Sequence, residues 1–284
     1  MKLNNLHSGW LLLGVLGVVA VQSVSAQDSP TLLEVPYVAT PQVTVDEMLR
    51  LANVGPQDFV LDLGSGDGRI VVTAAKKFGA RGLGVELDWR LVLQGEENAR
   101  QAGVEDRARF LEQDLFKTDL SQATVITTYL LPNVMLRLRP ALLALKPGTR
   151  IVSHDFDFGN WRPDQKTSIR KNVFLWIVPA RAAGRWQARL ELPPIERLLD
   201  LELTQRYQEV SAHARLNGVP SQVWEPKLVG DRLSFVVVDT TDREDEASLY
   251  FDGRVAGDVI EGEVSRGVGS ARATYGWRAI RRGP

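Results

Sequence analysis

Two carboxylates, Asp62 and Asp67, lie in a glycine-rich segment, Asp-Leu-Gly-Ser-Gly-Asp-Gly, at residues 62–68. Its glycines let the backbone turn sharply and come close to a ligand. The phosphates of a dinucleotide require free backbone N–H groups with no anion nearby, so the carboxylates argue against that ligand. S-adenosylmethionine (SAM) is net positive, with a sulfonium and an ammonium against one carboxylate, and suits the segment better. The residues expected to contact it here are Asp62, Gly64, Ser65, Gly66 and Asp67.

Two further acidic residues follow apolar runs at informative distances. Glu86 ends the run at 82–85, 22 residues after Gly64. An acidic side chain about 20 residues after such a loop can bind both ribose hydroxyls, and SAM has a free ribose. Asp114 follows the run at 108–112 and is placed to accept from the adenine amino group, with Leu115 or Phe116 against the ring. The alternatives are a tight turn that holds no ligand and an Asp114 that merely caps a loop.

Alternating strands and helices must position these residues. The predicted strands are 59–61, 82–85, 108–112, 123–129, 149–153 and 173–178, and the predicted helices are 69–78, 88–102 and 134–145. A further helix is expected before the first strand, with Thr44 as its N-cap and Glu47 completing a capping box. This alternation predicts a parallel sheet whose strands end at one ligand crevice. The residues brought to that rim are Asp62, Glu86, Asp114, Tyr129 and Asp155.

Several of these motifs resemble one known family. They are residues 36–40 (Pro-Tyr-Val-Ala-Thr), 62–70, 84–87, 108–110, 114–117 and 132–135. Their sequences and spacing resemble the class I SAM-dependent methyltransferases. Among these, the chain is most similar to the lysine methyltransferases of the ATP synthase c-subunit and of the adenine nucleotide translocase, and to their bacterial relatives. The resemblance covers roughly residues 33–162, about half of the chain.

That resemblance implies a Rossmann-like sheet with helices on both faces. It implies that Asp62, Gly64 and Gly66 hold the methionine end of SAM, Glu86 the ribose and Asp114 the adenine. It also implies a protein lysine as the acceptor, with a membrane-associated substrate among the options. The chain departs from the family at residues 128–132 (Thr-Tyr-Leu-Leu-Pro), where a more polar motif is common, and in its run at 154–157 and its C-terminal extension.

Lysine as an acceptor sets a chemical requirement. Methyl transfer needs donor and acceptor held in line about 3–3.5 Å apart, and an amine with a reference pKa near 10.4 must first lose its proton. Tyr129, His154 and Asp155 are the candidates to line that pocket. The alternatives are a strand-end aromatic for Tyr129 and a buried imidazole satisfied by the backbone for His154. Tyr37 and Thr40 either form a lid over SAM or pack beneath the first strand.

The composition bears on which acceptors and which metal sites the chain could have. The net charge of −1 does not indicate a nucleic-acid acceptor. The chain has no cysteine, which excludes disulfides and thiolate zinc sites, and its three histidines are scattered, so no metal site is predicted.

Residues 1–26 have the features of a signal peptide: Lys2, an apolar run at 10–21 and small residues at 24–26. We expect export to the periplasm, or a membrane anchor if the segment is uncleaved. Exposure to the cytoplasm stays open, because SAM is made there.

The C-terminal part, residues 183–284, has a different pattern. Leucines at 199, 201 and 203 alternate with polar residues, and turn signals occur at 217–218, 230–231 and 257–258. These predict an antiparallel barrel or sandwich of six to eight strands, faintly lipocalin-like, after a methyltransferase domain at 27–182. It could serve stability, partner docking or a second ligand. Three functions stay open: a protein-lysine methyltransferase, a small-molecule methyltransferase, and a non-catalytic protein that binds SAM or a partner.

Overall fold

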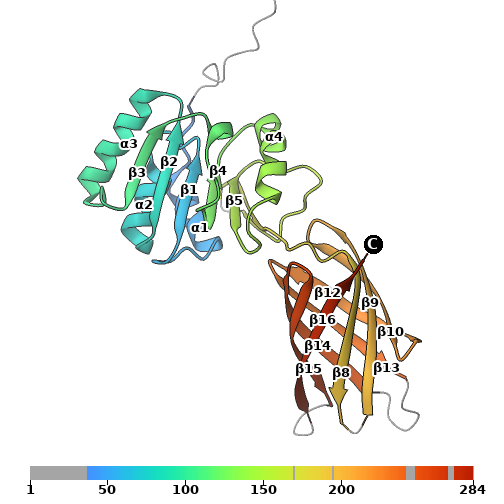
Figure 1. The fold of residues 1–284 in the computed structure, drawn as a ribbon. Coiled ribbons are helices and arrows are strands. Elements are labelled where there is room, and N and C mark those ends of the chain that lie inside the picture. Colours follow the sequence, from blue (N-terminus) through green and yellow to red (C-terminus); the bar gives the residue numbers. More distant parts are fainter. Residues whose placement is uncertain (1–36, 169, 194, 241–246, 268–271, 284) are drawn as a thin grey trace, which may run out of the picture. The chain divides into compact units, whose positions relative to one another are not determined.

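The computed structural model describes residues 37–283 except 169, 194, 241–246 and 268–271 (Figure 1). The predicted signal peptide lies outside these residues, so it and the localisation stay predictions. Within the described part, no helix has the length and apolar character needed to cross a membrane.

A seven-stranded sheet forms the first half of the described chain, in the order β3-β2-β1-β4-β5-β7-β6. β1 to β5 are parallel, and β7 runs antiparallel to both β5 and β6. The chain builds outward from β1 in one direction and then, from β4, in the other. A ligand crevice is expected where the order reverses, beyond the ends of β1 and β4. The strands are β1 (Phe59–Leu63), β2 (Arg81–Glu86), β3 (Ala108–Glu112), β4 (Val125–Thr128), β5 (Arg150–His154), β6 (Gln165–Ser168) and β7 (Asn172–Ile177).

Helices cover both faces of this sheet (Figure 1), which confirms the predicted fold class. Neighbouring residues of a strand point to opposite faces, so Val60 packs in the core on the α1 and α2 side while Leu61 packs in the core that contains α4. Both faces of the sheet are therefore buried at β1. The helices are α1 (Gln42–Leu51), α2 (Arg69–Phe78), α3 (Trp89–Ala102) and α4 (Pro132–Leu143), with the short 3₁₀ helix η2 (Leu115–Lys117).

Two predicted helix starts have different outcomes. Asp88 caps α3 as expected, accepting from the Arg90 N–H at 3.0 Å. The prediction for α1 is wrong: the helix begins at Gln42, directly after Pro41, and Thr44 lies inside its first turn. Glu47 accordingly forms no capping box and accepts from the Arg50 guanidinium instead. Proline presets a φ close to the helical value, so the chain enters the helix before the threonine.

The second sheet is antiparallel and nearly closed into a barrel, in the order β11-β10-β9-β8-β16-β15-β14-β13-β12 (Figure 1). The first strand along the chain, β8, pairs with the last, β16, through Ala188 and Ala279 in the middle of the sheet. At the two ends of the strand order, β10 lies close to β12, so the sheet wraps around one core. Of the two predicted architectures, the structure therefore has the barrel. It has nine strands rather than six to eight because of the three-residue β11. The strands are β8 (Gly184–Leu192), β9 (Ile195–Arg206), β10 (Glu209–Leu216), β11 (Val219–Ser221), β12 (Val223–Val229), β13 (Arg232–Asp239), β14 (Ala247–Ala256), β15 (Val259–Arg266) and β16 (Ala273–Arg282).

The barrel core is apolar but contains one ion pair. Phe235 stacks on Phe251 with ring centroids 4.6 Å apart, and Trp277 meets both rings edge-on. Arg197 Nε donates to Asp239 Oδ2 at 3.0 Å, with both side chains at most 3% exposed. Removing two charges from water is costly. Loss of either side chain would therefore leave the other charge buried without this partner.

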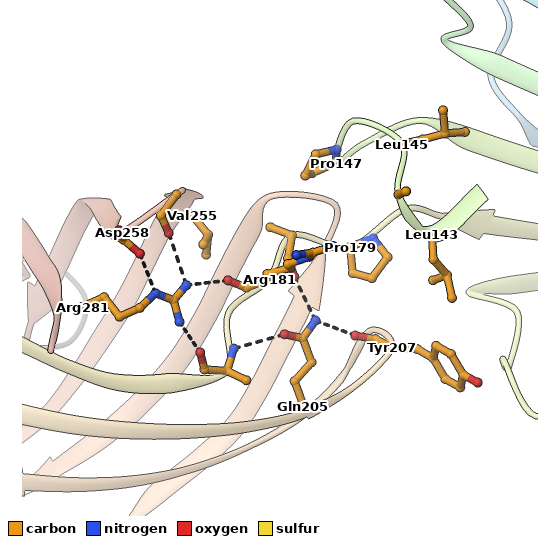
Figure 2. A pocket seen from close by; sticks show the side chains of 14 residues that line it. Leu143, Leu145, Pro147, Pro179, Arg181, Gln205, Tyr207, Val255, Asp258 and Arg281 are labelled. Carbon is orange, nitrogen blue, oxygen red and sulfur yellow. Dashed lines mark hydrogen bonds and ion pairs between the residues drawn. The ribbon is translucent and has the colours of Figure 1, made fainter. Parts of the chain in front are cut away.

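Residues 178–183 connect the two sheets, and side chains of the barrel hold them (Figure 2). Gln205 accepts from the Ala182 N–H and donates to the Ala180 carbonyl, both at 2.8 Å. Arg281 donates to the Arg181 carbonyl at 2.7 Å and to Asp258 at 2.9 Å. Through these bonds, the Arg281 guanidinium holds the connecting segment against the barrel. The exact domain limits, 27–182 and 183–284, stay a prediction.

Candidate functional site

The glycine-rich segment forms the turn between β1 and α2. Gly64, Gly66 and Gly68 have φ values of 79°, 52° and 77°, a region that side chains rarely adopt. Space is also restricted: a Cβ at Gly66 would collide with the Tyr37 ring, and one at Gly68 would lie 2.5 Å from the Phe110 ring. Glycine is thus required here for both conformation and close packing.

Asp62 ends β1 beside the point where the strand order reverses. Its side chain is buried, and Oδ1 accepts from the Thr127 hydroxyl at 2.6 Å. Oδ2 is also buried and has no hydrogen-bond partner among the described residues. Burial raises the pKa of Asp62 to about 7; the Thr127 bond opposes this, and the Glu86 and Asp67 carboxylates add to it.

A buried carboxylate oxygen without a partner is costly, and a cationic ligand would satisfy it. The residues present therefore fit SAM, whose ammonium is a hydrogen-bond donor with a positive charge. The same carboxylate, next to two others, would repel a diphosphate. This agrees with the expectation of SAM from the sequence; the contact of Asp62 with the methionine end of the donor stays a prediction.

Glu86 ends β2 and reaches back to the glycine turn. Its Oε2 accepts from the Gly66 N–H at 2.9 Å, and its Oε1 accepts from the N–H groups of Leu87 and Asp88 at 2.8 and 3.2 Å. A carboxylate offers about four acceptor positions, so these three bonds leave room for a ribose hydroxyl. Glu86 thus shapes the turn, a role that its position in the sequence did not reveal. Its predicted contact with the ribose stays a prediction.

Asp114 follows β3 and caps η2, because Oδ1 accepts from the Phe116 N–H at 2.9 Å. This bond is the alternative that the sequence left open, and it leaves the adenine contact as a prediction. Leu115 is buried in the core that includes Met135 of α4, and Phe116 lies under the Arg137 guanidinium at 4.0 Å. Phe116, half-buried at the surface of that core, is therefore the more accessible of the two side chains expected against the ring.

Asp67 and Ser65 differ in their hydrogen bonding within the chain. Asp67 forms an ion pair of 2.6 Å with Arg69. Burial would raise the pKa of Asp67, but its bonds with Arg69 outweigh this and hold the pKa below its usual value. The Ser65 hydroxyl is buried, close to Gly84 of β2, with no hydrogen-bond partner in the described part of the chain, and its predicted contact with SAM stays a prediction.

Residues 37–40 run beside the glycine turn. The Asp67 N–H donates to the Tyr37 hydroxyl at 3.4 Å, and Arg69 donates to the Thr40 carbonyl at 2.9 Å. The Thr40 hydroxyl lies 3.2 Å from Nδ1 of His154, at the end of β5. This segment thus links the glycine turn to His154. Whether Tyr37 and Thr40 cover SAM stays a prediction.

His154 and Tyr129 come together on the acceptor side. Their ring centroids are 4.0 Å apart. The imidazole is 2% exposed, and its Nε2 is buried without a hydrogen-bond partner among the described residues. Burial lowers the pKa of His154; Asp155 opposes this, and Lys171 adds to it. His154 is therefore neutral at neutral pH. The tautomer with its proton on Nδ1, donating to Thr40, presents a lone pair at Nε2.

Asp155 follows His154 with a φ of 65°, an unusual conformation for a residue with a side chain. Its Oδ2 forms an ion pair of 2.7 Å with Nζ of Lys171, the residue directly before β7. The sequence placed Asp155 at the rim but did not indicate its ion pair with Lys171. The sequence could not pair Thr127 with Asp62, or Lys171 with Asp155, because these partners lie on other elements. No group of three or more metal-ligating side chains occurs in the described residues.

The chain is similar to several known proteins. A family model for the ANTKMT methyltransferase domain matches residues 62–165. A protein-lysine N-methyltransferase of Saccharolobus islandicus is 41% identical over 151 residues, covering 51% of this chain and 94% of the relative. The lysine N-methyltransferase of the ATP synthase c-subunit from Mus musculus is 35% identical over 167 residues, covering 56% of this chain and 66% of that protein.

A solved structure described as an RNA methyltransferase from Salinibacter ruber, in complex with S-adenosyl-L-homocysteine, is 51% identical. It has a TM-score of 0.50, and the match covers 51% of this chain and 95% of that one. All of these similarities span about half of the chain or less. The descriptions of these proteins agree on methyl transfer and differ on the acceptor.

Proposed function

Because this chain belongs to the family of SAM-dependent protein-lysine methyltransferases, we propose that it methylates the ε-amine of a lysine in another protein. SAM is its methyl donor, and methyl transfer is its reaction type. The donor supplies an activated methyl carbon. The identity of the acceptor and the role of each side chain belong to the proposal.

On the donor side, Asp62 would take the ammonium of the methionine end with its unpaired Oδ2. Glu86 would hold the glycine turn and one ribose hydroxyl, and Asp114 the adenine. Ser65 would contact the donor beside them. Tyr37 and Thr40 would cover the methionine end, because their segment is tied to Arg69 at the start of α2.

The observation that carries the lysine assignment is the unpartnered Nε2 of a neutral, buried imidazole. A lysine ammonium must lose a proton before it can act as a nucleophile. His154 Nε2 is a proton acceptor in the tautomer that donates to Thr40, and general bases of this kind contribute about 10²–10⁴-fold to rates. Tyr129 would bound the pocket with its ring, and Asp155 would attract the incoming ammonium.

Two experiments test this proposal. Titration with SAM measures donor binding, and tritiated SAM added to a cell lysate shows where the methyl group goes. We expect a label that resists ribonuclease, is lost with protease, and is recovered as methyl-lysine after hydrolysis. Absence of SAM binding would contradict the methyltransferase assignment itself.

Other results of the lysate experiment would favour different acceptors. A ribonuclease-sensitive label would favour RNA, the acceptor class in the description of the Salinibacter structure. A label confined to small molecules would favour a small-molecule methyltransferase. Binding without transfer would favour a non-catalytic protein that binds SAM or a partner.

The proposal extends to location. The relative from mouse is described as acting on the c-subunit of ATP synthase, and a membrane-associated acceptor is our proposal for this chain too. Export through residues 1–26 is a further proposal, tested by mass spectrometry of the mature N-terminus. A mature chain that begins after Ala26 supports cleavage, while an intact Met1 would contradict it.

A further inference from the structure

The acceptor side of the rim contains a lysine of this chain. Lys171 lies 2.7 Å, measured from Nζ to Oδ2, from Asp155, the residue after the unpartnered imidazole. Strand pairing fixes this arrangement: His154 is opposite Val173, and the Asp155 N–H donates to the Asn172 carbonyl at 2.7 Å. The amine is thus brought to the end of β5 by the sheet itself.

β6 runs parallel to β5, because both are antiparallel to β7. The turn from β6 to β7 therefore lies at the carboxyl ends of the parallel strands, the edge that carries Asp62 and Glu86. Lys171 is near the end of this turn. Its side chain is 57% exposed, so its flexible four-carbon stem has room to move.

We propose that Lys171 is a self-methylation site, an acceptor within the same chain for the methyl group of bound SAM. This inference rests on the proposed lysine methyltransferase function. It adds a modification site and a specific first substrate.

The Nζ lone pair of Lys171 forms a bond to the methyl carbon, and the carbon–sulfur bond breaks with its electron pair left on sulfur. The products are methyl-lysine and S-adenosylhomocysteine. The proton lost from the ammonium passes to the Asp155 carboxylate, its hydrogen-bond partner, and then to water.

The surroundings of Lys171 make the reaction slow. The hydrogen bond and charge of Asp155 raise the pKa of Lys171, with a smaller contribution from Tyr129. The neutral amine is therefore scarce at neutral pH. Since its amount grows tenfold for each pH unit below the pKa, we expect self-methylation to rise by about tenfold per pH unit between pH 7 and 9.

The test uses purified full-length chain and tritiated SAM without another acceptor. We expect the chain to become labelled, its mass to rise in steps of one methyl group, and fragment spectra to place the methyl groups on Lys171. Lys171→Arg should lower the label at least tenfold, while an arginine still reaches Asp155. Lys166→Arg is the matched control, because Lys166 lies on neighbouring β6 over the Phe174 ring and should leave the label in place.

Two further measurements test whether Lys171 is methylated within its own chain and whether it faces the donor. At a SAM concentration well below the dissociation constant of the variant, a tagged Glu86→Ala chain mixed with wild type should gain far less label than wild type, because Lys171 reacts with the donor in its own chain. A measurement without turnover uses reductively ¹³C-methylated chain: added S-adenosylhomocysteine should shift the NMR signal of Lys171 and leave that of Lys166 unchanged.

The outcomes are distinguishable. Label in lysate proteins but none on Lys171 would overturn this inference and leave the proposed function standing. No label on any protein, despite SAM binding, would overturn both. Label on the tagged Glu86→Ala chain equal to that on wild type, or an unshifted Lys171 signal, would contradict a position facing the donor.

Discussion

Protonation of Asp62 should control the affinity for SAM. In the ligand-free chain its pKa is about 7, raised chiefly by burial. A bound ammonium favours the ionised carboxylate, so binding below pH 7 must release the proton of Asp62. Affinity should therefore fall as the pH is lowered. The useful range is about pH 5.5 to 7, where the α-amino group of the donor keeps its charge.

The magnitude follows from the fraction of Asp62 that is ionised. Relative to full ionisation, the dissociation constant rises about 2-fold at pH 7 and about 30-fold at pH 5.5 for a pKa of about 7. We therefore expect SAM to bind roughly 15-fold more weakly at the lower pH. Calorimetry in buffers of different ionisation enthalpy should detect the released proton directly.

The matched variant is Asp62→Asn, which still offers an acceptor to the Thr127 hydroxyl. It should bind SAM weakly and with little dependence on pH. Persistence of the wild-type pH dependence in this variant would refute the role given to Asp62 and shift attention to Asp67 or His154, which also lie at the rim. An affinity of wild type that is flat across the range would do the same.

The same shift in pKa affects stability. The folded pKa of Asp62 lies above its unfolded value of 3.8, so the folded state binds the proton more tightly. Stability from this group is fully present below about pH 4 and is lost as the pH rises to about 7, at about 1.4 kcal/mol per pH unit. Asp62→Asn should therefore stabilise the ligand-free chain more at pH 8 than at pH 5, as measured by denaturant unfolding.

Three other variants test separate parts of the structure. Glu86→Ala should weaken SAM binding by about ten- to over a hundredfold, because a hydrogen bond to a charged group contributes roughly 1.5–3 kcal/mol; unchanged affinity in a folded variant, with exposed Glu112→Ala as control, would exclude Glu86 from the donor site. His154→Gln should lower kcat for lysine methylation at pH 7 by about 10²-fold or more, with recovery at higher pH where the amine loses its proton unaided; a kcat equal to wild type would exclude His154 as the base. Asp239→Leu should lower the free energy of unfolding by about 3–5 kcal/mol, because it leaves the buried charge of Arg197 without this partner. Denaturant titrations should show recovery when Arg197→Met is added, and a cost below about 1 kcal/mol for Asp239→Leu alone would show that the pair is not effectively buried.

Much of the donor side could be predicted from the sequence, because it depends on short-range pattern. The glycine turn, its two aspartates and the spacing to Glu86 belong to one strand–turn–helix–strand unit, and the helix cap at Asp88 is equally local. β6 was missed for a related reason. Its four residues are polar and mostly exposed at the sheet edge, so they lack the apolar pattern by which strands are recognised.

Only the tertiary structure decided how the side chains are satisfied. Thr127 is 65 residues from Asp62, and His154 is 114 residues from Thr40; whether a buried oxygen or nitrogen is left unpaired depends on such distant partners. The ion pair of Asp155 with Lys171 likewise follows from the register of β5 with β7. Alternation predicted an antiparallel C-terminal sheet, but a barrel rather than a sandwich required the two ends of that sheet, at β10 and β12, to come together. Sequence pattern determines which face of an element is buried, whereas closure and pairing are set by contacts between elements far apart in the chain.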